Sequence, residues 1–174
     1  MSKFLHIPQS LNTIINWTGV VIVVATISSM FLALFVNVVL RYAFGKGIAW
    51  AYEIHNILFP WLVAGGAVMA AAKGSNIAVR ALVDILPVLL QRIVAILVHA
   101  FVAVLCIGVV YSSQPIVKAA QYSHLAETGI SQMYGYWSLL YAFSAIALVE
   151  ALFMLRLLLG ERTDESDHTT TSFS

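Results

Sequence analysis

Long apolar runs separated by short polar stretches make up most of this chain. No Asp, Glu, Lys or Arg occurs between Phe4 and Leu40. A helix that crosses the hydrocarbon core of a membrane needs about 20 apolar residues, and four runs in the chain are long enough. We therefore predict transmembrane spans at about 17–40, 50–72, 93–117 and 133–155. The fold class that follows is an all-α integral membrane protein with four transmembrane helices, in a domain of residues 17–158.

The stretch between the second and third spans, residues 75–91, is amphipathic rather than uniformly apolar. Arg80 and Asp84 lie four positions apart, so on a helix they share one face and can form an ion pair. Pro87 would kink or divide such a helix. We expect an amphipathic helix that lies in the membrane interface and leads into the third span. The alternative is an N-terminal extension of the third span itself.

The two ends of the chain carry less apolar character. Residues 1–16 precede the first span, and residues 159–174 are polar without apolar periodicity, so we expect a disordered tail there. With four spans, both ends and the connection 73–92 lie on one side of the membrane. That side carries six Lys and Arg residues against three on the other. The positive-inside rule therefore places both termini in the cytoplasm.

Composition excludes several classes of protein. Of the 174 residues 61% are apolar and 10% are charged, and the mean hydropathy is +0.92. A soluble domain carries about 25% charged residues, so a soluble enzyme and a disordered chain are both excluded. The net charge of +1 indicates no nucleic-acid partner. Cys106 is the single cysteine, which excludes a disulfide framework. We expect no catalytic residue, no metal site and no cofactor.

Polar residues near the ends of the first two spans are the first candidates for function, because charges are costly in hydrocarbon. Arg41 ends the first span and Glu53 lies near the start of the second. An ion pair between them would join the two helices, and the alternative is contact with a partner protein. Asn37, one turn before Arg41, is expected to hydrogen-bond to another helix. Trp50 is typical of the aromatic belt that anchors span ends at the membrane surface.

The middle of the second span carries a different set of residues. Trp61 lies eleven positions after Trp50, near the middle of the bilayer, so we expect it to pack against neighbouring helices. Gly65 and Gly66 would allow the backbone of another helix to approach closely. That helix could belong to this chain or to a partner.

The positions of the polar residues along the chain bear on two functions of small membrane proteins, haem binding and transport by a complete carrier. His55 and His99 would lie about 13 Å apart along the membrane normal, which is too far for one haem iron. Charged residues near the midplane and an internal repeat, both typical of complete transporters, are missing from the sequence. The residues alone therefore indicate an accessory subunit. The alternatives are a membrane anchor of an electron-transfer complex and a self-sufficient small oligomeric carrier, which would have to use Glu53 or Glu150.

Short motifs spread over residues 12–158 point to one family. They are LRYAFG at 40–45, WAYE at 50–53, Trp61 with Gly65 and Gly66, AKG at 72–74 followed by Asn76, Ile77 and Asp84, and TGIS at 128–131 with Trp137 and Tyr141. Together they resemble the small membrane subunit of TRAP transporters, the DctQ-like family. Asn76 stands where the family usually has histidine, and Ser131 stands where it often has proline.

The resemblance implies a small, non-catalytic scaffold subunit of a sodium-coupled secondary transporter in the bacterial inner membrane. Such transporters import organic acids, of the C4-dicarboxylate or sialic-acid type among others. A large multi-span permease subunit would hold the substrate and sodium sites and move as an elevator, and a periplasmic binding protein would deliver the substrate. This chain would pack beside the large subunit among membrane lipids, with room for a bound lipid. Arg41, Trp50 and Glu53 would shape the surface near the docked binding protein.

Overall fold

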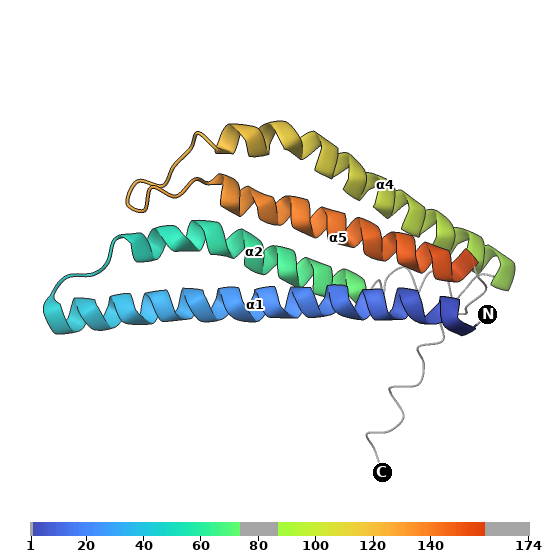
Figure 1. Cartoon of the computed structure of the whole chain (residues 1–174), viewed down its shortest axis with the longest axis horizontal. Coiled ribbons are helices and arrows are strands. Elements are labelled where there is room, and N and C mark those ends of the chain that lie inside the picture. The colour runs from blue at the N-terminus through green and yellow to red at the C-terminus, as the bar shows by residue number, and fades with distance from the viewer. Residues whose placement is uncertain (1, 74–86, 159–174) are drawn as a thin grey trace, which may run out of the picture.

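The computed structural model describes residues 2–73 and 87–158 (Figure 1). Its helices are α1 (Ser2–Phe44), α2 (Trp50–Ala72), α4 (Val88–Ala120) and α5 (Met133–Leu158). Each of the four is long and apolar enough to cross a membrane. The described residues contain no strand beyond a single bridge between His124 and Ser131. The prediction of an all-α protein with four membrane helices is confirmed.

The helices follow the predicted spans, but two of them extend further. α2 has the predicted bounds, and α5 begins at the predicted residue. α4 has 33 residues, and α1 has 43 and continues back to Ser2 through the segment predicted to precede the first span. At 1.5 Å per residue α1 is about 65 Å long, roughly twice the thickness of a hydrocarbon core. α1 must therefore extend beyond the hydrocarbon core or cross it at a strong tilt.

The predicted interfacial helix falls mostly on residues that the structure does not describe. Arg80 and Asp84 both lie outside the described residues, as does the predicted tail at 159–174. α4 begins at Val88, directly after Pro87, whose backbone is extended with ψ at 146°. Residues 88–91, which we predicted to belong to the interfacial helix, are therefore the first turn of α4. Proline fits just before this turn because it has no N–H to donate.

The helices form two antiparallel hairpins, α1–α2 and α4–α5, that pack side by side through α2 and α5 (Figure 1). α1 also touches α5, and among the described helices α4 packs only against α5. The four helices therefore form an open row with α1 and α4 at its edges. α2 and α5 run in the same direction in the middle of the row (Figure 1).

Small side chains fill the core where α1, α2 and α5 meet. The buried cluster consists of Ile15 from α1, Ala64, Val68 and Ala72 from α2, and Ala142 and Val149 from α5. Small residues allow helix backbones to approach closely in a membrane, where packing replaces the hydrophobic effect as the main attraction between helices. Large apolar side chains point outward instead. Phe31 and Phe101, for example, are 68% and 64% exposed.

Candidate functional site

Two connections lie together at one end of the molecule, which we call the loop end (Figure 1). Residues 45–49 join α1 to α2, and residues 121–132 join α4 to α5. The opposite end, which carries the start of α1 and the end of α5, is called the terminal end. Of the predicted site residues, those at or near the loop end are Asn37, Arg41, Trp50 and Glu53. Those deeper along α2 are Trp61, Gly65 and Gly66.

Glu53 holds the connection between α4 and α5. Its carboxylate accepts hydrogen bonds from the backbone N–H of Glu127 at 2.9 and 3.0 Å. It also accepts from the backbone N–H of Thr128 at 2.9 Å and from the Thr128 hydroxyl at 3.2 Å. Hydrogen bonds to an ionised acceptor are stronger than those between neutral groups. Glu53 therefore links the α1–α2 hairpin to the α4–α5 hairpin, and we call this set of bonds the Glu53 latch.

The expected ion pair between Arg41 and Glu53 is absent from the described residues. The Glu53 carboxylate is instead occupied by donors from the other hairpin. Whether Arg41 or Glu53 also contacts a partner protein, the alternative we considered, stays a prediction.

The connection at 121–132 is a compact turn that presents its N–H groups to Glu53. The N–H of Leu125 donates to the Ile130 carbonyl at 2.9 Å, and the N–H of Gly129 donates back to the Leu125 carbonyl at 3.0 Å. Gly129 has a φ of 65°, a conformation that glycine adopts without steric cost. These bonds close the turn, so two successive N–H groups, those of Glu127 and Thr128, can reach one carboxylate.

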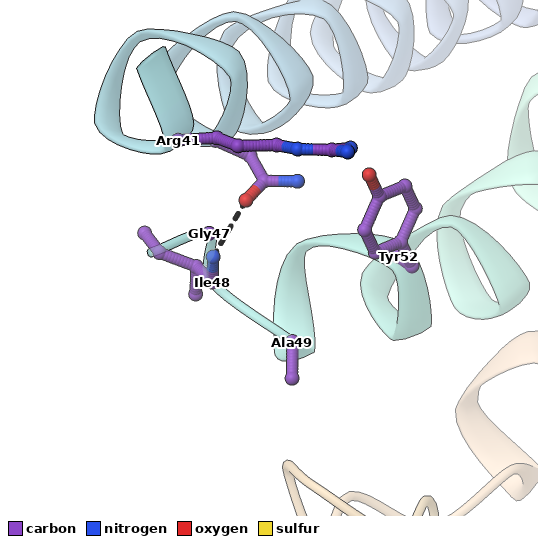
Figure 2. A pocket seen from close by; sticks show the side chains of 6 residues that line it. Arg41, Gly47, Ile48, Ala49 and Tyr52 are labelled. Carbon is purple, nitrogen blue, oxygen red and sulfur yellow. Dashed lines mark hydrogen bonds between the residues drawn. The ribbon is translucent and has the colours of Figure 1, made fainter. Parts of the chain in front are cut away.

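Asn37 holds the other connection. Its side chain is 2% exposed, and its Oδ1 accepts a 2.6 Å hydrogen bond from the backbone N–H of Ile48, drawn as the dashed line in Figure 2. A Cβ added to Gly47 would lie 2.8 Å from this oxygen, so a larger residue here would displace the Asn37 side chain. The sequence predicts that Asn37 bonds to another helix. It bonds instead to the turn after its own helix, because that turn folds back onto α1.

Arg41 lies at a shallow pocket beside this turn. The pocket has a volume of about 260 Å³ and is lined by Asn37, Arg41, Gly47, Ile48, Ala49 and Tyr52. Figure 2 shows the Arg41 and Tyr52 side chains entering it from α1 and α2. Arg41 makes no ion pair and no side-chain hydrogen bond with any described residue. The pocket therefore holds a positive charge that no described residue neutralises.

Two tryptophans of α2 have different surroundings. Trp50 is 45% exposed at the start of the helix, and its role as an interface anchor stays a prediction. Trp61 packs inside the row, with its ring centroid 5.8 Å from that of Tyr141. Its indole N–H donates to the Tyr134 carbonyl at 2.9 Å, and the Tyr141 hydroxyl lies 2.8 Å from the Thr18 hydroxyl. These contacts join α1, α2 and α5, in keeping with the packing role predicted for Trp61.

Gly65 lies at a close contact between α1 and α2. A Cβ added to Gly65 would lie 3.0 Å from the carbonyl oxygen of Gly19 and 3.0 Å from a methyl group of Val23. The close neighbour of Gly65 is therefore α1 of the same chain. Gly66 differs, since a Cβ added there would have nothing within 4 Å. Only one of the two glycines is needed for this crossing.

One polar pair inside the helices was missed in the sequence. His99 Nδ1 on α4 lies 2.5 Å from Glu150 Oε2 on α5, and Glu150 is 4% exposed. The His99 ring also stacks on Phe153, with centroids 5.6 Å apart. His99 is eleven residues into α4 and Glu150 is eight residues before the end of α5. Their similar depth from the terminal end is the signal in the sequence that points to this pair.

Comparisons with known proteins point to one family. The family described as tripartite ATP-independent periplasmic transporters, DctQ component, matches residues 30–160. A Haemophilus influenzae protein named as a TRAP transporter small permease is 26% identical over 152 residues, which cover 87% of each chain. A second Haemophilus influenzae protein with the same name is 32% identical over 60% of this chain and 65% of the relative.

A third relative has a more specific name. The C4-dicarboxylate TRAP transporter small permease protein DctQ of Vibrio cholerae is 36% identical over 78 residues, which cover 45% of this chain and 32% of the relative. The family match spans most of the chain and includes α2, α4, α5 and the C-terminal part of α1. The chain therefore belongs to the DctQ family, the small permease component of tripartite ATP-independent periplasmic transporters.

Proposed function

We propose that this chain is the non-catalytic scaffold subunit of a sodium-coupled importer of organic acids. In this proposal a larger multi-span permease subunit carries the substrate and sodium sites, and a periplasmic binding protein delivers the substrate. Membership of a tripartite transporter family supports both partners. The Vibrio cholerae relative is named for C4-dicarboxylates, which supports an organic acid as the substrate class.

The orientation that fits this function places the loop end in the periplasm. Membership of a periplasmic transporter family and four apolar helices support a multi-pass protein of the bacterial inner membrane. The cations on the loop side are Arg41, Lys46 and Lys118. Those on the terminal side are more numerous, namely Lys3, Lys73, Arg80, Arg92, Arg156 and Arg162. The positive-inside rule then places both termini in the cytoplasm.

The observation that carries the scaffold role is the Glu53 latch. A transporter that moves substrate through a large mobile subunit needs a neighbour that stays fixed. The latch and Asn37 hold connections 121–132 and 45–49 against the helices, so the loop end is built as one surface from both hairpins. A surface of this kind suits the docking of a soluble binding protein, with Arg41 and Trp50 beside it.

Replacing Glu53 with alanine tests this role. The variant removes the acceptor of the bonds from Glu127 and Thr128, so connection 121–132 loses its attachment to α2. We expect docking of the binding protein and substrate uptake to fall about tenfold in vesicles that contain the complete transporter. The amount of assembled membrane complex should stay near the wild-type level, because the helix contacts remain.

Glu127→Ala is the matched control. It removes the same charge from an exposed side chain close by, while the backbone N–H of residue 127 still reaches Glu53. Uptake and docking should be close to wild type in this variant. Wild-type docking and uptake in Glu53→Ala, or an equal loss in the two variants, would contradict the role of the latch.

A further inference from the structure

The loop-end pocket combines an unpaired cation with a lining that contains no acidic residue. The Arg41 guanidinium has no partner among the described residues, and the carboxylate expected to neutralise it is held by the Glu53 latch. A cation at the end of a membrane helix gains a large interaction energy from any oxyanion that reaches it, because the surroundings screen charge less than bulk water does. The pocket is therefore suited to an anion.

The other polar side chains of the pocket also favour an anion. Asn37 uses its Oδ1 to accept from Ile48, so the amide group left without a partner is the Nδ2 donor. Tyr52 supplies a hydroxyl that can donate. α2 begins beside the pocket, and Ala49 before it provides no side-chain cap, so the positive end of the helix dipole adds to the Arg41 charge. The polar side chains around the space shown in Figure 2 can thus all donate to an anion.

Apolar and aromatic surroundings indicate where the anion comes from. Ile48, Ala49 and the Tyr52 ring line the pocket. Tyr42, Phe44 and Trp50, which flank it in sequence, are 86%, 75% and 45% exposed. Exposed aromatic side chains at span ends lie at the level of the lipid headgroups. An arginine at that level meets phosphate groups, which it can bind through two parallel hydrogen bonds.

We propose that this pocket binds the phosphate group of a phospholipid, with Arg41 as the principal ligand and with Asn37 Nδ2 and the Tyr52 hydroxyl as further donors. The acyl chains would then run along the exposed apolar surface of α1 and α2. This site requires only that the loop end lies at a membrane surface, so it does not depend on the transport function. Its volume of about 260 Å³ fits a headgroup fragment and leaves the acyl chains outside.

Native mass spectrometry of the purified chain with added phosphatidylglycerol tests the site. Arg41→Gln should retain at least about fivefold less of this lipid than wild type. Lys46→Gln is the matched control, because Lys46 is an exposed cation of the same connection that does not line the pocket. It should retain wild-type amounts. Equal retention in all three proteins, or an equal loss in both variants, overturns the proposal.

A second variant tests the site even if Arg41→Gln fails to fold. Ala49→Asp places a carboxylate in the pocket, and a negative charge at the start of α2 favours the helix. The variant should therefore stay folded, with a thermal midpoint near the wild-type value, and still lose phosphatidylglycerol. Full retention of the lipid by folded Ala49→Asp overturns the proposal.

Two further measurements identify the source of the anion. Millimolar inorganic phosphate should leave the bound phosphatidylglycerol in place, because the acyl chains contribute to lipid binding; displacement by phosphate alone means that the pocket is a site for soluble anions. The second measurement compares Arg41→Gln with wild type both in retention of phosphatidylglycerol, which should fall, and in docking of the periplasmic binding protein. Normal lipid retention together with lost protein docking means that a protein carboxylate occupies the pocket, which overturns the lipid assignment.

Discussion

Replacing Gly65 with leucine will push α1 away from α2 and strongly destabilise the subunit. A Cβ at this position already lies 3.0 Å from the Gly19 backbone oxygen, and the remaining leucine atoms have no space between the two helices. Overpacking of this kind costs about 3 kcal/mol, which corresponds to a fall of about 10 °C in the thermal midpoint for a chain of this size. Tryptophan fluorescence of the purified subunit during heating in detergent measures the thermal midpoint.

Gly66→Leu is the control for this experiment. It makes the same change one residue further along α2, at a position where an added Cβ has nothing within 4 Å. We expect a thermal midpoint within about 2 °C of wild type for Gly66→Leu, since an exposed leucine also favours the helix over glycine. A similar loss of stability in the two variants would show that the crossing at Gly19 and Gly65 does not hold α1 to α2.

The second large effect is expected at the buried pair of α4 and α5. Glu150→Ala removes the partner of His99 and leaves the imidazole without its hydrogen bond between the helices. Breaking a buried pair costs about 3–5 kcal/mol in soluble proteins, whereas single hydrogen bonds between membrane helices contribute about 0.6 kcal/mol. We expect a loss of about 2 kcal/mol. Because α4 packs only against α5 among the described helices, protease cleavage within α4 should rise.

A double-mutant cycle separates the pair from its surroundings. His99→Ala and Glu150→Ala should each destabilise the chain, and the double variant should cost clearly less than the sum of the two, since each single change already removes the bond. Additive losses would mean that the contact at 2.5 Å contributes nothing to stability.

The spans could be predicted because the thickness of the membrane sets their length, and charged residues mark the boundaries between them. The full lengths of α1 and α4 could not be predicted in this way, because a helix continues as long as its backbone hydrogen bonds form, in water as well as in lipid. Arg92 illustrates the difference. Its sequence position suggests only a cation near the membrane surface, yet its side chain donates to the Leu157 carbonyl at 2.5 Å and so caps α5, 65 residues further along the chain.

The residues of the candidate site could be predicted, but their partners could not. The sequence predicts that Glu53 pairs with Arg41, because the two residues flank one short connection. The actual donors to Glu53 are mainly backbone N–H groups 74 and 75 residues away. Every residue except proline has such a group, so the sequence does not show which of them will reach Glu53. The pair of His99 and Glu150 was predictable in principle, since two residues on adjacent antiparallel helices meet when their depths are equal.

Affinity purification of the tagged chain from gently solubilised native membranes, followed by mass spectrometry, shows whether the chain is the scaffold subunit of a larger transporter. A scaffold subunit should bring down a much larger multi-span membrane protein in a one-to-one ratio, and that complex should bind a periplasmic substrate-binding protein. Recovery of a soluble redox enzyme, or of this chain alone as an oligomer that transports substrate in vesicles, would contradict the account.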